Sequence, residues 1–134
     1  MKKATVLIVM IFIMLCSFSG LQGCTARNGN YKDGVYDEKQ NSSTKHGYEE
    51  AIVTINGGRI DTIELKRLDE NQVEVNYDDW DGTKNGMPNL KKYRVDMAKA
   101  MISKQSADVD SISGATASSE GWKAATTAAL AKAK

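Results

Sequence analysis

The sequence is poor in the residues from which hydrolytic and metal centres are built. Its 134 residues include one His, His46, and two Cys, Cys16 and Cys24. No Ser–His–Asp or Cys–His arrangement is recognisable, and we expect His46 to be a surface loop residue rather than a metal ligand. The 18 basic and 17 acidic residues nearly balance and form no basic run, which argues against a nucleic-acid partner. The sequence also lacks internal repeats and a nicotinamide-binding fingerprint.

A hydrophobic run long enough to span a bilayer is also lacking. The apolar stretch Val6–Cys16 is shorter than the roughly 20 residues that a spanning helix needs. It follows Lys2-Lys3 and precedes small residues, which is the pattern of a secretory signal peptide; an uncleaved anchor helix is the alternative. The exit Leu21-Gln22-Gly23-Cys24 resembles a bacterial lipobox. We therefore predict a signal peptide over 1–23 and lipidation of Cys24, with two or more acyl chains needed for stable anchoring.

Removal of that segment would leave 111 residues with a net charge of about −1 and Cys24 as their only Cys, so no disulfide is expected. This length is enough for one small core, to which a bound cofactor could add stability. The polar residues that follow Cys24 predict a flexible tether over 24–32. A domain is then predicted over 33–134.

Alternating apolar residues predict strands in the first half of this domain. Tyr48–Ile55 and Arg59–Leu68 flank Gly57-Gly58 and form a β-hairpin. Asp33–Tyr36 is a short first strand or more linker, followed by a loop to Lys45, and Gln72–Tyr77 is a further strand.

The second half changes to a helical period. After a loop over Asp78–Pro88, a helix from Asn89 has one apolar face. A connector or short strand over 106–110 leads to a final helix capped by Ser118 or Ser119. The predicted inner faces are Leu90, Tyr93, Met97, Met101 and the adjacent Ala100 in the first helix, and Trp122, Ala125, Ala129, Leu130 and Ala133 in the second. We predict an α+β fold, a small antiparallel sheet with two helices packed on one face.

The most informative stretch is Asp110-Ser111-Ile112-Ser113-Gly114-Ala115-Thr116. It places the Thr116 hydroxyl at the start of a helix, where a phosphate ester would meet free N–H groups and the positive end of the helix dipole. Gly114 and Ala115 remove bulk beside this hydroxyl, and Ser113 adds a polar group near the phosphate. Asp110 is a recognition residue or orients the loop as an acceptor. Four small residues alone would equally suit an ordinary helix-start turn.

The seven-residue stretch resembles the flavinylation motif of the FMN-binding domain family, with Ser111 where Gly or Ala is usual. The resemblance spans about 33–131 and includes an opening strand, Asp33-Gly34-Val35-Tyr36. It implies that Thr116 carries FMN through a phosphoester, transferred from FAD by a magnesium-requiring flavin transferase. Thr116 is then an acceptor, and the chain itself contributes no catalytic residue. The family occurs in ion-translocating respiratory complexes and in extracytoplasmic flavin lipoproteins.

An isoalloxazine ring needs an apolar wall and a few hydrogen bonds. Tyr77, Trp80 and Met87 flank the long loop, and we name Tyr77 and Trp80 as candidate ring contacts. The alternatives are a core residue for Tyr77 and a loop anchor for Trp80. Asp78, Asp79 and Asp81 lack the closing acidic residue of a calcium loop.

These patterns predict a lipid-anchored flavoprotein on the extracytoplasmic face of the cell membrane. Its covalent FMN would take electrons from a membrane donor and pass them on, which makes it an electron carrier rather than a stand-alone enzyme. Three alternatives remain: a non-covalent FMN carrier or sensor, a small flavin reductase, and a lipoprotein without a cofactor.

Overall fold

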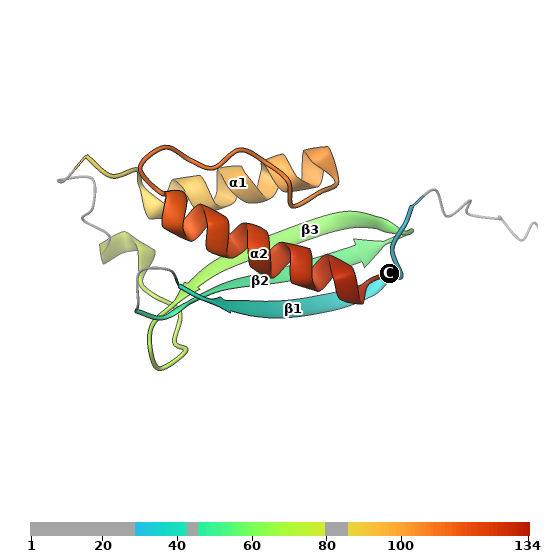
Figure 1. Ribbon diagram of the computed structural model, residues 1–134, viewed down its shortest axis with the longest axis horizontal. Helices are drawn as coiled ribbons and strands as arrows, with labels where there is room; N and C mark the ends of the chain where they lie inside the picture. Colours follow the sequence, from blue (N-terminus) through green and yellow to red (C-terminus); the bar gives the residue numbers. More distant parts are fainter. Residues whose placement is uncertain (1–28, 43–45, 80–85) are drawn as a thin grey trace, which may run out of the picture.

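The computed structural model describes residues 29–42, 46–79 and 86–134. The predicted signal peptide, Cys24 and Trp80 lie outside these ranges. The elements follow in the order β1 (Gly34–Asn41), β2 (Tyr48–Asn56), β3 (Arg59–Leu68), the 3₁₀ helix η1 (Tyr77–Asp79), α1 (Leu90–Lys104) and α2 (Thr116–Lys132). Both α-helices lie on the same face of the sheet (Figure 1), which confirms the predicted α+β fold.

The three strands form an antiparallel sheet in the order β1-β2-β3. The predicted hairpin is β2–β3, and its turn residues Gly57 and Gly58 have φ of 61° and 76°. The first strand is longer than the sequence predicted, because its polar half pairs with β2 as far as Asn41↔Tyr48. Backbone pairing at a sheet edge tolerates polar side chains, so the loop expected from Asp37 to Lys45 was wrong for residues 37–41.

The strand predicted over Gln72–Tyr77 is also wrong. This segment makes a single bridge, Leu68↔Glu74, and then enters η1. The Asp69 carboxylate accepts the N–H groups of Asn71 at 2.8 Å and Val73 at 2.9 Å, and Gln72 has a φ of 63°. This turn chemistry overrides the alternating pattern, and Val73 is left exposed.

The helices begin differently. α1 has the Asn89 side chain as its N-cap, accepting the Lys92 N–H at 3.0 Å. α2 begins at Thr116 after Ala115, and its start has no side-chain cap, so the predicted cap at Ser118 or Ser119 was wrong. The predicted inner face of α2 is confirmed as buried, and that of α1 is confirmed except that Ala98 replaces Ala100.

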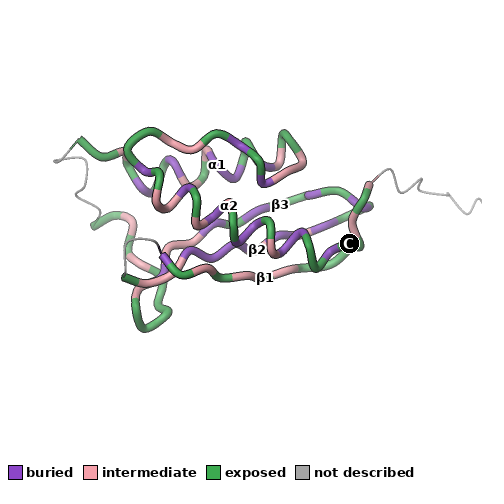
Figure 2. The backbone as a smooth tube through the Cα atoms, in the orientation of Figure 1, coloured by how far each residue is buried: buried purple, intermediate pink, exposed green. Residues whose placement is uncertain are grey.

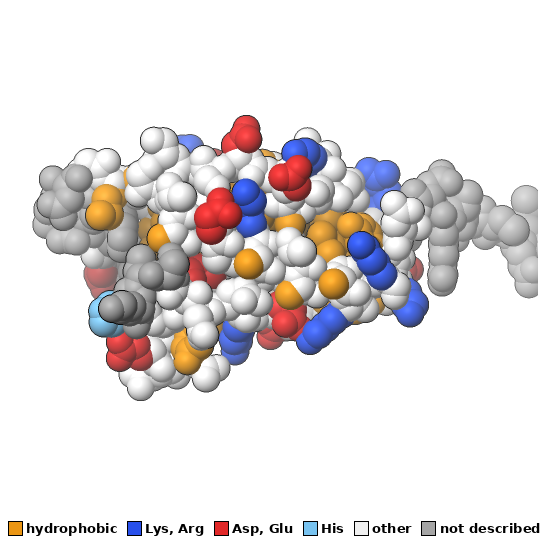
Figure 3. All heavy atoms as spheres, viewed as in Figure 1, with side chains coloured by type: hydrophobic (Ala, Val, Ile, Leu, Met, Phe, Trp, Pro, Cys, Tyr) orange, Lys and Arg blue, Asp and Glu red, His pale blue; other side chains and the backbone are white. Residues whose placement is uncertain are grey.

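The core lies between the helices and the sheet, where Figure 2 shows buried residues on both layers. Trp122 is fully buried, its ring centroid lies 5.7 Å from that of Tyr93, and its indole N–H donates to the Lys66 carbonyl at 2.8 Å. Small Ala side chains on α2 let this helix lie close to β1 and β2. On the face seen in Figure 3, acidic and basic side chains are interspersed.

The ends of the described chain lie together at one end of the domain. The connection 105–115 runs back along α1, so α1 and α2 are parallel and start at the opposite end (Figure 1). The last residues of the predicted tether lie against the β2–β3 turn and α2: Tyr31 N–H donates to Gly58 O at 3.3 Å, and Lys32 N–H donates to Ala133 O. Within residues 29–42, 46–79 and 86–134, no helix has the length and apolarity to cross a membrane.

Candidate functional site

The loop before α2 has a backbone that requires glycine. Gly114 has a φ of 80°, in the left-handed region, and a Cβ at this position would lie 3.0 Å from Cδ of Pro88. The Ala115 N–H donates to the Ile112 carbonyl at 2.9 Å and closes the turn. Gly114 therefore serves both a left-handed turn and a close approach to the segment that leads into α1.

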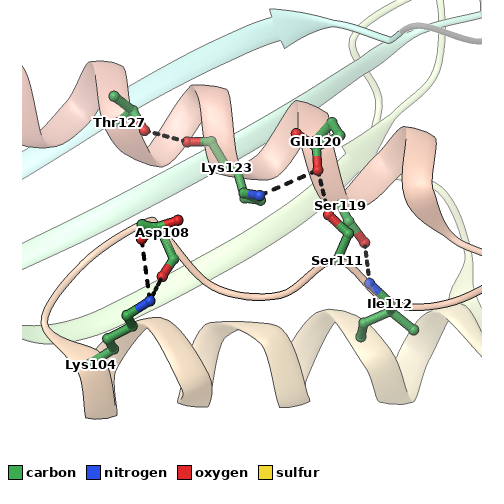
Figure 4. A network of polar contacts seen from close by, with 8 residues as sticks. All are labelled: Lys104, Asp108, Ser111, Ile112, Ser119, Glu120, Lys123 and Thr127. Carbon is green, nitrogen blue, oxygen red and sulfur yellow. Dashed lines mark hydrogen bonds and ion pairs between the residues drawn. The ribbon is translucent and has the colours of Figure 1, made fainter.

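Two hydroxyls hold this loop on α2, as Figure 4 shows. The Ile112 N–H donates to Oγ of the buried Ser119 at 3.2 Å. Ser111 Oγ donates to the Glu120 carboxylate, and Lys123 lies 3.3 Å from the same oxygen. The hydrogen bond from Ser111 is the main cause that holds the pKa of Glu120 below its usual value, and the hydrogen bond from Lys123 is the second. Ser111, the one unusual residue of the motif, thus has a structural contact of its own.

The start of α2 suits an anion. Its first i→i−4 hydrogen bond runs from Ser119 N–H to Ala115 O at 3.0 Å. The N–H groups of residues 116–118 therefore come before the first hydrogen bond of this helical series. With no side-chain cap, these groups and the helix dipole offer positive partial charge beside the exposed Thr116. Ser113 and Asp110 are also exposed. Among the described residues the Asp110 carboxylate accepts no hydrogen bond, so its predicted part in ordering the loop through N–H bonds is not seen.

A cavity of about 390 Å³ opens beside Thr116. Residues 114–118 form one part of it, and Met87, Pro88 and Leu90 supply an apolar part. Asn76 and Asp79 add polar groups, and the other lining residues are Arg67, Val75 and Tyr93. Its volume lies within the range of about 300–1,000 Å³ that is usual for small-molecule sites, and its mixture of apolar walls and a few polar groups is also typical.

Arg67 reaches the cavity from β3 and is held by a buried carboxylate. It pairs across the hairpin with Glu49 of β2, and its guanidinium donates to the Glu49 carboxylate and to Ser42 Oγ, the latter at 2.6 Å. Glu49 has no exposed surface. Burial raises the pKa of Glu49 above its ordinary value, and the adjacent Arg67 charge opposes this effect.

Sequence reasoning missed this pair, although a signal was present. Glu49 and Arg67 stand at inward-facing positions of the predicted hairpin, where opposite charges face each other across the strands. A charged residue at such a position needs a partner, because burial of a single charge is costly. Tyr93 was predicted only as a core residue, yet it also lines the cavity.

Within the described residues, neither of the two predicted ring contacts, Tyr77 and Trp80, is seen beside the Asp110–Thr116 stretch. Tyr77 does not line the cavity: its hydroxyl accepts the Arg67 N–H at 3.0 Å, and the Arg94 guanidinium lies 4.0 Å from its ring centroid. Burial raises the pKa of Tyr77 to about 12. A flavin role for Tyr77 stays a prediction, and Trp80 lies outside the described residues. Met87, which flanks the same loop, does line the cavity.

His46 is exposed, with Nδ1 2.6 Å from the Glu70 carboxylate. In the part of the chain that the structure describes, no three His, Cys, Asp or Glu side chains are grouped to hold a metal ion.

Comparison with known proteins identifies the family. The family model of the FMN-binding domain matches residues 45–131 of the sequence. The chain belongs to the FMN-binding domain family. Its fold is also similar to the crystal structure of the CPE2226 protein from Clostridium perfringens, with a TM-score of 0.66 and 25% sequence identity over 78% of this chain and 89% of that one. No curated protein matches the chain significantly.

Membership of the FMN-binding domain family supports a flavin cofactor, and the site can be tested for its fit to one. The uncapped start of α2 suits the phosphate, and the adjacent cavity is large and apolar enough for part of a ring system. The residues present therefore fit FMN: residues 114–118 would hold its phosphate, and Met87, Leu90, Tyr93 and Arg67 would line the space for the ring.

Proposed function

We propose that this protein carries FMN covalently on Thr116 and transfers electrons from a membrane-bound donor. The observation that carries the proposal is the exposed Thr116 at the uncapped start of α2, at the edge of a cavity of about 390 Å³. Gly114 clears the approach to this residue, since any side chain there would meet Pro88. A phosphate attached to this hydroxyl would lie against the N–H groups at the start of α2, which supports the proposal.

The attachment needs a second enzyme. Thr116 Oγ1 bonds to the phosphorus of the FMN half of FAD, the pyrophosphate bond breaks, AMP leaves, and the hydroxyl proton is lost. Among the described residues, no side chain hydrogen-bonds to the Thr116 hydroxyl to act as a base. A flavin transferase therefore activates the Thr116 hydroxyl, and the domain supplies an accessible acceptor and a binding position for the phosphate.

Anchoring through Cys24 completes the proposal. Outside the membrane a freely dissociating cofactor would be lost, and a phosphoester prevents this loss. The bound flavin supplies the redox chemistry, while the domain fixes its position and shields part of it from water. Replacement of Cys24 by Ala is expected to abolish the mass of the attached acyl chains, as intact-mass measurement of the detergent-extracted protein would show.

The test of attachment uses the full chain expressed with and without a flavin transferase. We expect in-gel flavin fluorescence after denaturation and a mass gain of one FMN less water, only with the transferase. Thr116→Val should abolish both signals, and Thr116→Ser should retain them. Thr127→Val is the matched control, because Thr127 is also exposed on α2 but bonds the Lys123 carbonyl away from the cavity.

Three outcomes would contradict the proposal in different ways. An adduct that persists in Thr116→Val would place the attachment at another residue. Flavin that copurifies with the native protein but is lost on denaturation would favour the non-covalent carrier, which the cavity could also serve. A wild-type chain that takes up no flavin in either form would refute flavin binding here.

A further inference from the structure

We propose that Arg67, held in place by Glu49, makes the flavin cavity electrostatically positive and stabilises the reduced flavin. This inference rests on the proposed function, because it requires the FMN ring to occupy the cavity beside Thr116. Glu49 is a positioning residue in this scheme, since it acts through Arg67.

The geometry gives this ion pair a direction. Arg67 lines the cavity, whereas Glu49 does not and has no exposed surface. Glu49 lies beside the guanidinium and is buried under α2, where a Cβ on Gly121 would be only 2.7 Å from Glu49 Oε2. The pair therefore presents its positive end to the cavity and its negative end to the interior.

Several contacts fix the guanidinium in this orientation. It donates to the Glu49 carboxylate, to Ser42 Oγ and to the His46 carbonyl, while the backbone N–H of Arg67 donates to the Tyr77 hydroxyl. These partners come from β2, from the connection between β1 and β2, and from η1. A charge held by so many fixed partners needs little reorganisation when the charge of a neighbouring group changes.

Among the described residues, the other charged group that lines the cavity is Asp79, and its field is weaker than that of Arg67. Asp79 is exposed and accepts from the Asn76 side-chain amide at 2.7 Å, so water and ions screen its negative charge. The Arg67 side chain is 16% exposed, and its field is less screened. Of the described charged residues in the lining, Arg67 therefore contributes most of the field that a ring in the cavity would experience.

The field of Arg67 affects the flavin because the charge of the ring changes on reduction. The oxidised ring is neutral; when it takes two electrons from a reductant and one proton from water, it gains one negative charge. A guanidinium beside the ring stabilises that charge and raises the reduction potential. For a two-electron couple, each tenfold change in the preference for the reduced form corresponds to about 30 mV.

The experiment measures the midpoint potential of the FMN-loaded full chain by dithionite titration against reference dyes. Arg67→Met alone would leave the Glu49 charge buried without its partner, so the change is made together with Glu49→Leu, which replaces the pair by apolar groups. We expect this double variant to favour the reduced flavin tenfold less, a shift of about −30 mV. Arg67→Lys should retain most of the wild-type potential, because the charge is kept.

Two further variants make the result decisive. Glu49→Gln removes the negative partner and should shift the potential upwards, opposite to the double variant. Arg94→Met is the matched control, because its guanidinium packs on Tyr77 outside the cavity, and it should leave the potential unchanged. If the double variant folds poorly, the upward shift of Glu49→Gln and the retention in Arg67→Lys still test the sign.

An unchanged potential in the double variant, or a downward shift in Glu49→Gln, would overturn the proposal. Mass spectrometry of each sample reports the FMN adduct separately, so loss of attachment is distinguished from loss of electrostatic tuning. If FMN binds only without a covalent bond, the same potentials can be measured on the non-covalent complex. A wild-type chain that binds no FMN would refute both this inference and the proposed function.

Discussion

Replacement of Gly114 by Ala tests the link between the loop backbone and the flavin site. The residue has a φ of 80°, and a left-handed conformation costs a residue with a Cβ about 1–2 kcal/mol. The new Cβ would also lie 3.0 Å from Pro88 Cδ, which forces the loop or the proline ring to move. Overpacking adds roughly 1 kcal/mol, so we expect a loss of about 2–3 kcal/mol in the free energy of unfolding.

Gly57→Ala separates the two contributions. Gly57 has a φ of 61°, but a Cβ there would meet nothing within 4 Å. It should therefore lose only the backbone part, about 1–2 kcal/mol. Combining Gly114→Ala with Pro88→Ala should relieve the clash and bring the two glycine sites to similar losses.

Urea denaturation of the full chain, followed by tryptophan fluorescence, measures these changes. FMN incorporation by the transferase is measured in parallel, and it should be slowed in Gly114→Ala but not in Gly57→Ala. Equal stability losses at the two sites, together with an unchanged rate of FMN incorporation, would refute the structural reasoning about this loop.

Other substitutions test the packing around the cavity. Gly121→Ala should destabilise by about 1–3 kcal/mol despite better helix propensity, because its Cβ would meet Glu49. Thermal melting should show that the same glycine substitution costs much less in a Glu49→Ala background than in the wild type. Tyr77→Phe should lose about 1 kcal/mol by leaving the Arg67 N–H without an acceptor. Since the pKa of Tyr77 is raised to about 12, wild-type stability should fall between pH 10 and 12, and urea midpoints of the Phe variant should lack this component. Similarly, the raised pKa of Glu49 stabilises the folded state below pH 4.5 and loses this effect as pH rises through the folded value. The Glu49→Gln variant has no carboxyl group at this position, so it should not lose stability in this way as the pH rises. The difference in melting temperature, variant minus wild type, should therefore be larger at pH 7 than at pH 4.5.

The sequence predicted the parts of the fold that depend on local periodicity. The hairpin with its Gly57-Gly58 turn and both helices were found because the spacing of apolar residues differs clearly between a strand and a helix. The errors arose where long-range pairing or side-chain hydrogen bonds decide. β1 continues to Asn41 through pairing with β2. Residues 72–77 form a turn with a single bridge to Leu68 because the Asp69 carboxylate accepts the N–H groups of Asn71 and Val73.

The candidate site was predictable in part for a similar reason. The Asp110–Thr116 stretch is contiguous, so its chemistry could be recognised without a structure. The cavity beside it is assembled from β3, η1, α1 and the segment before α1, and no local pattern indicates that Arg67 and Tyr93 meet there. Only the cross-strand register of Glu49 and Arg67 carried a usable signal.

The parallel course of α1 and α2 has a consequence for any attachment to this domain. Residues 29–33 and Ala133 meet at the C-terminal end of α2, whereas Thr116 lies at its other end. A helix of 17 residues separates these ends by about 25 Å. Whatever the chain is fixed to, through either terminus of the described domain, the cavity lies at the opposite end of α2. A fusion partner or surface linkage at either end should therefore leave the site open to a second protein, as an electrode-mounted or tandemly linked domain would require.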